Sequence, residues 1–235
     1  MNIPQDLVSK YTMNGEVKIE EYYFAPYADN TSKTYTLNQI NHYKTMVLNK
    51  QGAYYPDTDV LLYSAFEHYS IKNKDVIVVG SEQPWYETMA LINSGKSCTC
   101  LEYNKRICEC DEIKYHQYND FVQLKERKFD VCISVSSIEH SGLGRYGDIV
   151  DPDGDIKAMD DIKSLLKPGG LLFLSVPVGE DRVMWNAHRV YGKKRFKVLL
   201  AGWEVLQTYG IDNNILTTSA NSRATVQPVI VLRSL

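Results

Sequence analysis

From residue 75 onward, short apolar runs alternate with segments of helical pattern. The runs are DVIVVG (75–80), SCTCLEYN (97–104), IKYHQY (113–118), KFDVCISVSSIEH (128–140) and LLFLSVPVG (171–179). Apolar, β-branched runs of this length are typical of strands that are covered on both faces. Strands that alternate with helices form right-handed crossovers and a mostly parallel sheet with helices on both faces. The alternation therefore predicts an α/β, doubly wound fold.

The chain ends in two further strand-like runs, GWEVLQTYG (202–210) and PVIVLRSL (228–235). We expect them to pair antiparallel at one edge of the sheet, which brings it to seven strands. Helices are predicted over QPWYETMALINSG (83–95) and over 154–170, where KPGG ends the second. The run RICECDEI (106–113) is predicted to be a short helix or turn.

Tyrosine is concentrated at the N-terminal end, where ten of the 17 tyrosines lie within the first 74 residues. Residues 1–56 are polar and weakly periodic, with a helix expected near 36–49. We therefore predict an N-terminal extension (1–56) and a catalytic domain (57–235). The tyrosine rings of the extension either pack on the neighbouring domain or form a lid that walls a substrate pocket.

The overall charge excludes some classes of partner. The formal net charge is −3 and the pI is about 6.0, which argues against a nucleic-acid binder that relies on a broad basic surface. No apolar run approaches the roughly 20 residues that span a bilayer, and the N-terminus does not have the pattern of a signal peptide. We expect a cytoplasmic protein with no membrane partner, compatible with homo-oligomer formation.

The five cysteines form the patterns CTC and CEC plus a single Cys132. An odd number without a leader indicates reduced thiols. Four thiolates could hold zinc, but zinc ligands are more often separated by two or more residues, and Cys98 and Cys100 fall on a predicted strand. We therefore expect no metal at the cysteines.

Polar and charged residues follow the predicted strands at their carboxyl ends. They include Gly80–Glu82, Glu102, Ser136–His140 and Pro177–Gly179. In open parallel sheets, ligands bind at this edge, where the strand order reverses. A carboxylate such as Glu102, held at a strand end, can accept two hydrogen bonds from a vicinal diol.

The order of these features resembles the Rossmann-like class I methyltransferases that use S-adenosylmethionine. The resemblance rests on Gly80 after the first strand, Glu102 about twenty residues later, and the blocks FDVCISVSSIEH and LKPGGLLFLSVP. It implies that Glu102 accepts hydrogen bonds from the ribose hydroxyls and that Asp120 contacts the adenine edge. The cofactor-binding residues that it implies are Gly80, Ser81, Glu82, Glu102, Asp120 and Ser136.

A closer resemblance covers about residues 75–210. The blocks SSIEHSGLGRYGDIVDPDGD, LKPGGLLFLSVPVGED and NAHRVYGKKRF are similar to an uncharacterised, methyltransferase-like domain family first described from nematode sequences. This resemblance implies the fold but supplies no substrate.

Two histidines are candidates for the catalytic base. The resemblance places His140 just after the fourth strand, near the methyl group that is transferred, with His188 as the second candidate. A histidine there can take a proton from an attacking hydroxyl, because its ordinary pKa lies near neutral pH. The alternative is a structural histidine that binds a backbone carbonyl or orients the substrate.

The substrate pocket is expected to form from the loops after the fourth and fifth strands. Arginines there could hold an anionic or polyhydroxylated acceptor, or could instead bind backbone carbonyls. The candidate residues are Arg145, Tyr146, Asn186, Arg189 and Tyr191.

Asp151, Asp153 and Asp155 offer an alternative metal site. The pattern lacks the glycine and the final acid of a calcium loop, so we expect Asp155 to cap a helix that begins at Ile156, and no metal.

Trp85 decides whether the predicted cofactor site is open. The turn after the first strand has a single glycine, followed by SEQPW. If the indole points into the pocket it narrows the methionine site, and if it points into the helix–sheet core the site is open.

The sequence thus predicts an S-adenosylmethionine-dependent enzyme that methylates a small polar acceptor, with a hydroxyl of a sugar or glycan precursor as the expected target. The alternative is a non-catalytic methyltransferase-like module that binds a partner protein. A nicotinamide-dependent enzyme is disfavoured, because the G-x-G-x-x-G pattern is missing.

Overall fold

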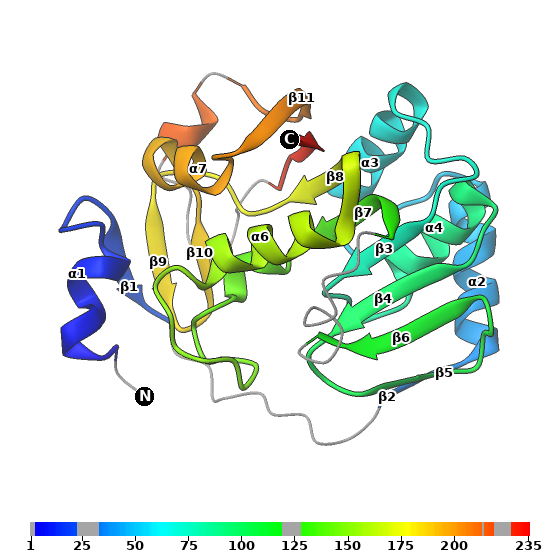
Figure 1. Cartoon of the computed structure of the whole chain (residues 1–235), viewed down its shortest axis with the longest axis horizontal. Coiled ribbons are helices and arrows are strands. Elements are labelled where there is room, and N and C mark those ends of the chain that lie inside the picture. Colours follow the sequence, from blue (N-terminus) through cyan, green and yellow to red (C-terminus); the bar gives the residue numbers. More distant parts are fainter. Residues whose placement is uncertain (1–2, 23–32, 119–127, 213, 219–226) are drawn as a thin grey trace.

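The computed structural model describes residues 3–22, 33–118, 128–212, 214–218 and 227–235. Its centre is a seven-stranded sheet with the order β11-β12-β8-β7-β3-β4-β6 (Figure 1). These strands are β3 (Val76–Val79), β4 (Cys98–Glu102), β6 (Ile113–Gln117), β7 (Phe129–Val135), β8 (Leu166–Ser175), β11 (Trp203–Tyr209) and β12 (Val229–Ser234). The α/β, Rossmann-like fold predicted from the alternation is confirmed.

Strand directions follow the prediction. β3 pairs parallel with both β4 and β7, while β12 runs antiparallel to both β8 and β11. The strand order therefore reverses between β3 and β7, which places the carboxyl ends of these two central strands side by side. β8 begins at Leu166, earlier than the predicted 171, because the helix before it ends at Leu165 and the LKPGG segment belongs to the strand.

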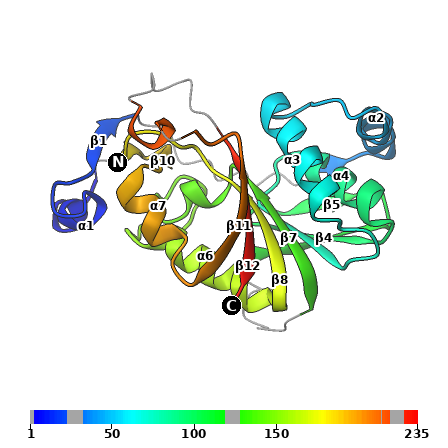
Figure 2. The same ribbon diagram turned by 90° about the horizontal axis from the view of Figure 1, so that it is seen from above.

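Helices cover both faces of the sheet (Figure 2). One face packs against α3 (Pro56–His68) and α4 (Trp85–Ser94), with α2 (Leu37–Leu48) packed on α4, and the other against α6 (Gly154–Leu165) and α7 (Lys193–Leu199). Along β3, Val76 and Val78 point to the first core, whereas Ile77 and Val79 point to the second. This alternation within a wholly apolar strand is what a sheet buried on both faces requires.

α4 lies beside the first strand and fixes the turn that joins them. Most of its side chains are buried, because it packs against the sheet on one side and α2 on the other. It ends at Gly95, whose φ of 68° is the left-handed conformation that closes a helix.

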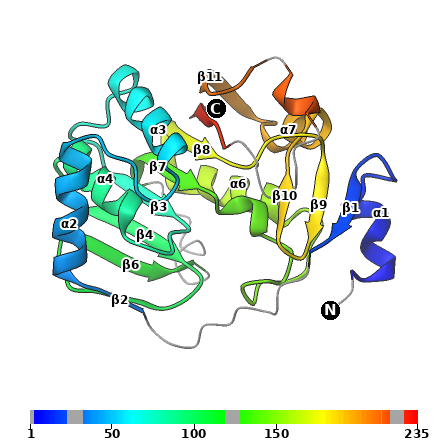
Figure 3. The same ribbon diagram turned by 180° about the vertical axis from the view of Figure 1, so that it is seen from behind.

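Two small sheets flank the central one. β1 (Lys18–Glu21) pairs parallel with β9 (Arg182–Trp185), and β10 (His188–Val190) pairs antiparallel with β9 (Figure 3). β2 (Lys33–Tyr35) pairs parallel with β5 (Arg106–Cys108). The prediction of a helix or turn for RICECDEI is wrong, because residues 106–108 form a strand with a partner that lies about 70 residues earlier in the chain.

The remaining short elements are η1 (Gln5–Leu7), α1 (Val8–Tyr11), η2 (Ile138–His140) and η3 (Ile215–Thr217). None of the helices in the described part of the chain has the length and apolar character of a membrane-spanning segment.

Candidate functional site

A pocket of about 470 Å³ opens at the carboxyl ends of β3, β4 and β7. It lies where the strand order reverses, which is the ligand-binding position of open α/β sheets. Of the cofactor-binding residues predicted from sequence, it brings together Gly80, Ser81, Glu82, Glu102 and Ser136. Asp120 falls outside the described residues.

The turn after β3 is held by hydrogen bonds from its backbone N–H groups to residues of β4. Gly80 has a φ of 73°, and its N–H donates to the carbonyl of Leu101 at 2.9 Å. The next N–H, of Ser81, donates to Oε2 of Glu102 at 3.0 Å. Glu102 is therefore fixed against the turn, at the position where a bound nucleoside would meet it.

Glu102 also accepts hydrogen bonds on its other oxygen. Oε1 takes one from the N–H of Tyr103 at 2.8 Å. Burial raises the pKa of this carboxyl, and the nearby Arg106 guanidinium opposes that shift. Oε1 also accepts from the N–H of Asn104 at 3.5 Å, whereas Oε2 has a second lone pair that can still accept a hydroxyl donor.

The side chains of Ser81 and Glu82 already have protein partners. Ser81 Oγ donates to Glu87 Oε2 at 2.9 Å, inside the protein, so its side chain turns away from the pocket. Glu82 forms an ion pair with Lys33 at 2.9 Å and accepts a hydrogen bond from Tyr54. The bond to Lys33 is the main reason that the pKa of Glu82 is lowered.

Ser136 ends β7 in a rare conformation. Its φ of 49° lies in the left-handed region, which is costly for a residue that is not glycine. Its Oγ donates to Glu139 Oε1 at 2.7 Å and accepts from Gln227 Nε2 at 3.3 Å. Backbone strain of this kind is common at functional sites.

Both candidate bases lie in the pocket wall. His140 Nδ1 donates to the carbonyl of Ala187 at 2.6 Å, which leaves Nε2 as the acceptor. Burial is the main cause that lowers the pKa of His140 to about 3 and that of His188 to about 4. Both rings are therefore neutral at pH 7 and only weakly basic.

The five predicted substrate residues separate into two groups. Arg145 and Tyr146 line the pocket, and the guanidinium of Arg145 lies 5.0 Å from the centre of the Tyr146 ring. Asn186, Arg189 and Tyr191 are buried and lie outside the lining. This placement corrects the expectation of direct substrate contact for the last three.

Arg189 and Tyr191 have structural partners instead. Arg189 donates to backbone carbonyls of the loop that follows η2, with Nη1 at 2.6 Å from the oxygen of Ser141. Tyr191 donates its hydroxyl to Asp155 at 3.1 Å. Arg189 thus follows the alternative left open from sequence, that of an arginine bound to carbonyls.

The three aspartates of the 151–155 segment pair with basic side chains, and Asp153 and Asp155 share Arg195. Asp151 pairs with Lys157, whereas Asp155 is fully buried and pairs with Arg195. Asp155 does not cap the helix as predicted, because α6 begins at Gly154 with Asp153 at the cap position. Among the described residues, no group of three or more His, Cys, Asp or Glu side chains is arranged to hold a metal ion.

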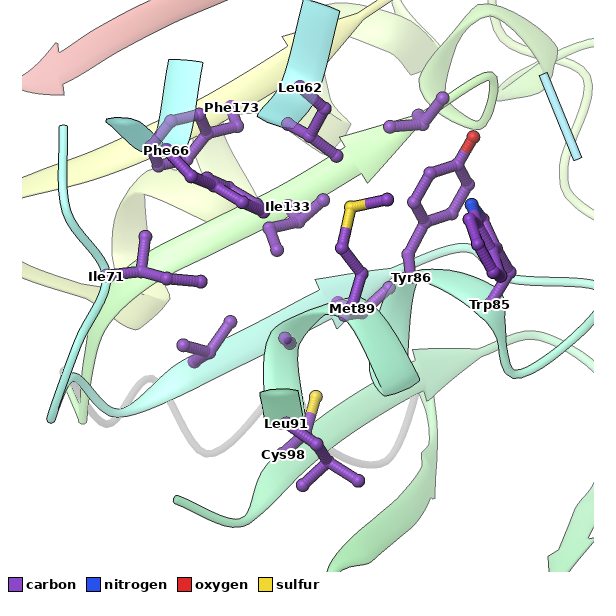
Figure 4. Close-up of a cluster of buried hydrophobic side chains, with 14 of the residues drawn as sticks. Leu62, Phe66, Ile71, Trp85, Tyr86, Met89, Leu91, Cys98, Ile133 and Phe173 are labelled. Carbon is purple, nitrogen blue, oxygen red and sulfur yellow. The ribbon is translucent and has the colours of Figure 1, made fainter. Parts of the chain in front are cut away.

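Trp85 points into the core and leaves the pocket open. Its side chain is fully buried and packs edge-on against Tyr43, with ring centres 5.3 Å apart. Figure 4 shows the indole beside Tyr86 and Met89, within the apolar cluster under α4. Trp85 is absent from the pocket lining, whereas Tyr86 contributes to it.

The sequence prediction missed several residues of the pocket. Tyr22, Tyr54 and Tyr55 of the N-terminal extension line it, as the lid interpretation of the tyrosine-rich segment would require. Glu139 stands beside His140 in a motif that was recognised, but no role was assigned to it. Arg106 lies four residues after Glu102, in the run that was predicted to be a helix or turn, and Gln227 lies just before the last strand; neither was assigned to the pocket.

Comparison with solved structures shows the fold. A Burkholderia thailandensis 1,6-didemethyltoxoflavin-N1-methyltransferase, solved with 1,6-didemethyltoxoflavin and S-adenosylhomocysteine, is similar at 14% identity over 82% of this chain and 83% of that one, with a TM-score of 0.51. A structure provisionally assigned as a sarcosine dimethylglycine methyltransferase from Galdieria sulphuraria matches at 12% identity over 76% of this chain and 84% of that one, with a TM-score of 0.50. The structure of the [4+2]-cyclase SpnF matches at 14% identity over 87% of this chain and 99% of that one, with a TM-score of 0.49.

Comparison by sequence gives a family without an assigned activity. A search of curated proteins finds no significant match. A family model described as Caenorhabditis protein of unknown function, DUF268, matches residues 73–233, which include the seven strands of the central sheet apart from the last residue of β12. The chain therefore belongs to the DUF268 family, and its fold is that of the class I methyltransferases.

Proposed function

We propose that the protein is an S-adenosylmethionine-dependent methyltransferase that acts on a small polar acceptor. The observation that carries the proposal is the convergence of Gly80, Glu102 and Ser136 on one pocket at the strand-order reversal. The structurally similar 1,6-didemethyltoxoflavin-N1-methyltransferase, which was solved with S-adenosylhomocysteine, supports the same cofactor class.

The cofactor would lie along the ends of β3 and β4. Glu102 is oriented by the N–H groups of Ser81 and Tyr103, and it would accept hydrogen bonds from the two ribose hydroxyls. Glu82 would contact the amino group of the methionine part, sharing its carboxylate with Lys33. Asp120 stays a prediction for the adenine edge.

The acceptor would lie on the side of the pocket formed by η2 and β10. Arg145, Tyr146 and His188 line that side and offer polar groups to a hydroxylated molecule. Since His140 and His188 are weak bases, we assign them to orientation of the acceptor. A sugar or glycan-precursor hydroxyl remains our proposed target, supported by the polar and aromatic character of this wall.

The reaction would be an in-line displacement at the sulfonium methyl group. The acceptor oxygen forms a bond to the methyl carbon as the carbon–sulfur bond breaks, and the electron pair stays on sulfur in S-adenosylhomocysteine. The pocket contributes mainly by holding the two reactants in line.

Titration calorimetry with S-adenosylmethionine and S-adenosylhomocysteine tests the proposal. We expect binding by the wild type and none by Glu102→Ala, because the ribose diol would lose its acceptor. Glu204→Ala, which removes an exposed acid on β11 outside the pocket, is the matched control and should bind normally. Failure of the wild type to bind either compound at millimolar concentration would refute the assignment.

One observation favours a non-catalytic module as the second candidate. Both Glu102 and Glu82 already hold bonds to their own chain, which stabilise the pocket without a ligand. In that case the tyrosine-rich extension, residues 1–56, would contact a partner protein. Cofactor binding without methyl transfer to any acceptor would support this second function.

We also propose that the chain divides at residue 56 into an extension and a catalytic domain. We propose in addition a cytoplasmic location and a homo-oligomeric state. Size-exclusion chromatography coupled to light scattering would test the last of these.

A further inference from the structure

The carboxyl end of β7 carries a hydrogen-bonded pair that leads from the pocket wall into the protein. Ser136 lines the pocket, and its hydroxyl donates to Glu139 Oε1 at 2.7 Å. Gln227 Nε2 donates to the same hydroxyl oxygen. Because Ser136 Oγ accepts from one side, its proton is directed toward Glu139.

Glu139 is a buried carboxyl group with an unused acceptor. Its side chain is completely buried, and Oε2 accepts no hydrogen bond from the described part of the chain. A buried carboxylate is costly unless it is paired, and polar atoms in folded proteins are rarely left without a partner. An unpaired carboxylate oxygen beside a pocket is available to a further donor.

Burial and the groups around Glu139 act in opposite directions on the charge of its carboxyl. Among the titratable groups, the His140 ring lies beside Glu139, with Nε2 at 3.6 Å from Oε1, and that ring is neutral at pH 7. Burial raises the pKa of Glu139 to about 7, against a smaller opposing effect of Arg145. The other groups that face it are Tyr55, Tyr146, Tyr191 and Arg189.

We propose that Ser136 and Glu139 form a proton relay that removes the proton from the methyl acceptor. This inference rests on the proposed function and assigns the base, which the histidines do not supply. As the acceptor oxygen attacks the methyl carbon, its O–H bond breaks and the proton passes to Ser136 Oγ. Ser136 in turn transfers its own proton to Glu139, whose carboxylate becomes the neutral acid.

The backbone at Ser136 supports this role. Ser136, in the left-handed conformation after β7, lines the pocket, where its hydroxyl can contact an acceptor. The carboxyl of Glu139 behind it is buried from solvent. A base that titrates near the working pH transfers protons most effectively, because it combines the correct protonation state with sufficient basicity.

The relay is tested by carbon-13 NMR titration of labelled glutamate carboxyls in the whole protein. We expect one resonance with a midpoint near pH 7 that is absent from Glu139→Gln. In Ser136→Ala the same midpoint should rise, because the carboxylate loses a donor that stabilises its charged form. A Glu139 midpoint near the ordinary value of about 4.3, or one unaffected by Ser136→Ala, would overturn the relay.

Calorimetry with S-adenosylhomocysteine on the same samples separates the relay from the proposed function. Binding retained in Glu139→Gln, together with loss of methyl transfer by about 10²-fold or more, supports the relay. Transfer would be followed as S-adenosylhomocysteine release with a panel of monosaccharides and polyols. Unimpaired transfer in Glu139→Gln overturns the relay, whereas absence of cofactor binding in the wild type overturns the proposed function and leaves the NMR result to decide the titration of Glu139.

Discussion

Gly80 and Ser137 are packed so closely that a β-carbon on Gly80 would lie 1.8 Å from Ser137 Oγ. The two residues follow β3 and β7, the neighbouring strands between which the strand order reverses. Both residues line the pocket. Glycine is therefore required at position 80 by the approach of the second strand, in addition to any approach of a ligand.

Gly80→Ala should destabilise the protein strongly. The new β-carbon would collide with Ser137, and the φ of 73° would add strain of about 1 kcal/mol or more. We expect a loss of roughly 3 kcal/mol in the free energy of unfolding, measured by urea denaturation. Gly95→Ala is the matched control, since its φ is 68° but nothing lies within 4 Å of its β-carbon position. Equal losses in the two variants would show that the contact with Ser137 does not matter.

The central sheet could be predicted from sequence because its information is local. β3, β4, β7 and β8 are apolar runs that end in polar residues, and the helices between them have clear end signals such as Gly95. The β2–β5 pair could not be predicted, since neither three-residue strand carries a pattern and each depends on the other for its hydrogen bonds.

The candidate site was predictable where it follows a strand. Gly80, Glu102 and Ser136 were placed together because the carboxyl ends of central strands meet at one edge of the sheet. Arg189 and Tyr191 were misplaced for a physical reason: their residue types fit a polar pocket as well as a buried network. The choice depends on Asp155 and the loop carbonyls, whose positions only the fold determines.

Glu87 should position the turn that holds Glu102. It is fully buried, accepts hydrogen bonds from Ser81 Oγ at 2.9 Å and Tyr115 at 2.8 Å, and has its pKa raised by burial. Glu87→Ala would remove the acceptor of the Tyr115 hydroxyl and the contact that holds Ser81 to α4, while Ser81 Oγ keeps its bond to the carbonyl of Gln83. We expect weaker binding of S-adenosylhomocysteine, by about tenfold, because each lost buried hydrogen bond costs about 1–3 kcal/mol.

Glu87→Gln separates positioning from charge. The amide keeps the volume and one acceptor oxygen, so it should retain most of the cofactor affinity measured by calorimetry. If Glu87→Gln lost as much affinity as Glu87→Ala, the role would depend on ionisation of the carboxyl, and the positioning argument would fail.

The ion pair between Arg195 on α7 and Asp155 on α6 should contribute strongly to the stability of the fold. Both side chains are largely buried, and Tyr191 donates to the same aspartate. Arg195→Ala would leave the buried Asp155 with Arg189, 3.6 Å away, as its remaining ionic partner, so we expect a loss of about 3 kcal/mol in unfolding free energy. The exposed pair Arg233–Glu204 provides the control, and Arg233→Ala should cost no more than about 0.5 kcal/mol. Thermal and urea unfolding of both variants would measure the contrast.

His140 should make the protein sensitive to acid. Burial lowers the pKa of His140 from 6.5 to about 3, so below pH 6.5 the unfolded chain takes up a proton that the folded protein does not bind. Stability is therefore lost as the pH falls, by about 2 kcal/mol between pH 7 and pH 5 from this residue. In His140→Asn, whose amide can still donate to Ala187, this loss should disappear from urea unfolding curves recorded at the two pH values.

Glu139 should make the protein less stable as the pH rises, which is the opposite of the effect of His140. Burial raises the pKa of Glu139 from 4.5 to about 7, so its contribution to stability is fully present below pH 4.5 and is lost as the pH rises through 7. Glu139→Gln has no proton to lose, and its stability relative to the wild type should increase by up to about 3 kcal/mol between pH 4.5 and pH 8. Urea unfolding of the wild type and the variant across this range gives the difference directly. A difference that stays constant with pH would mean that Glu139 is ionised throughout, and would remove the basis for its role as a base.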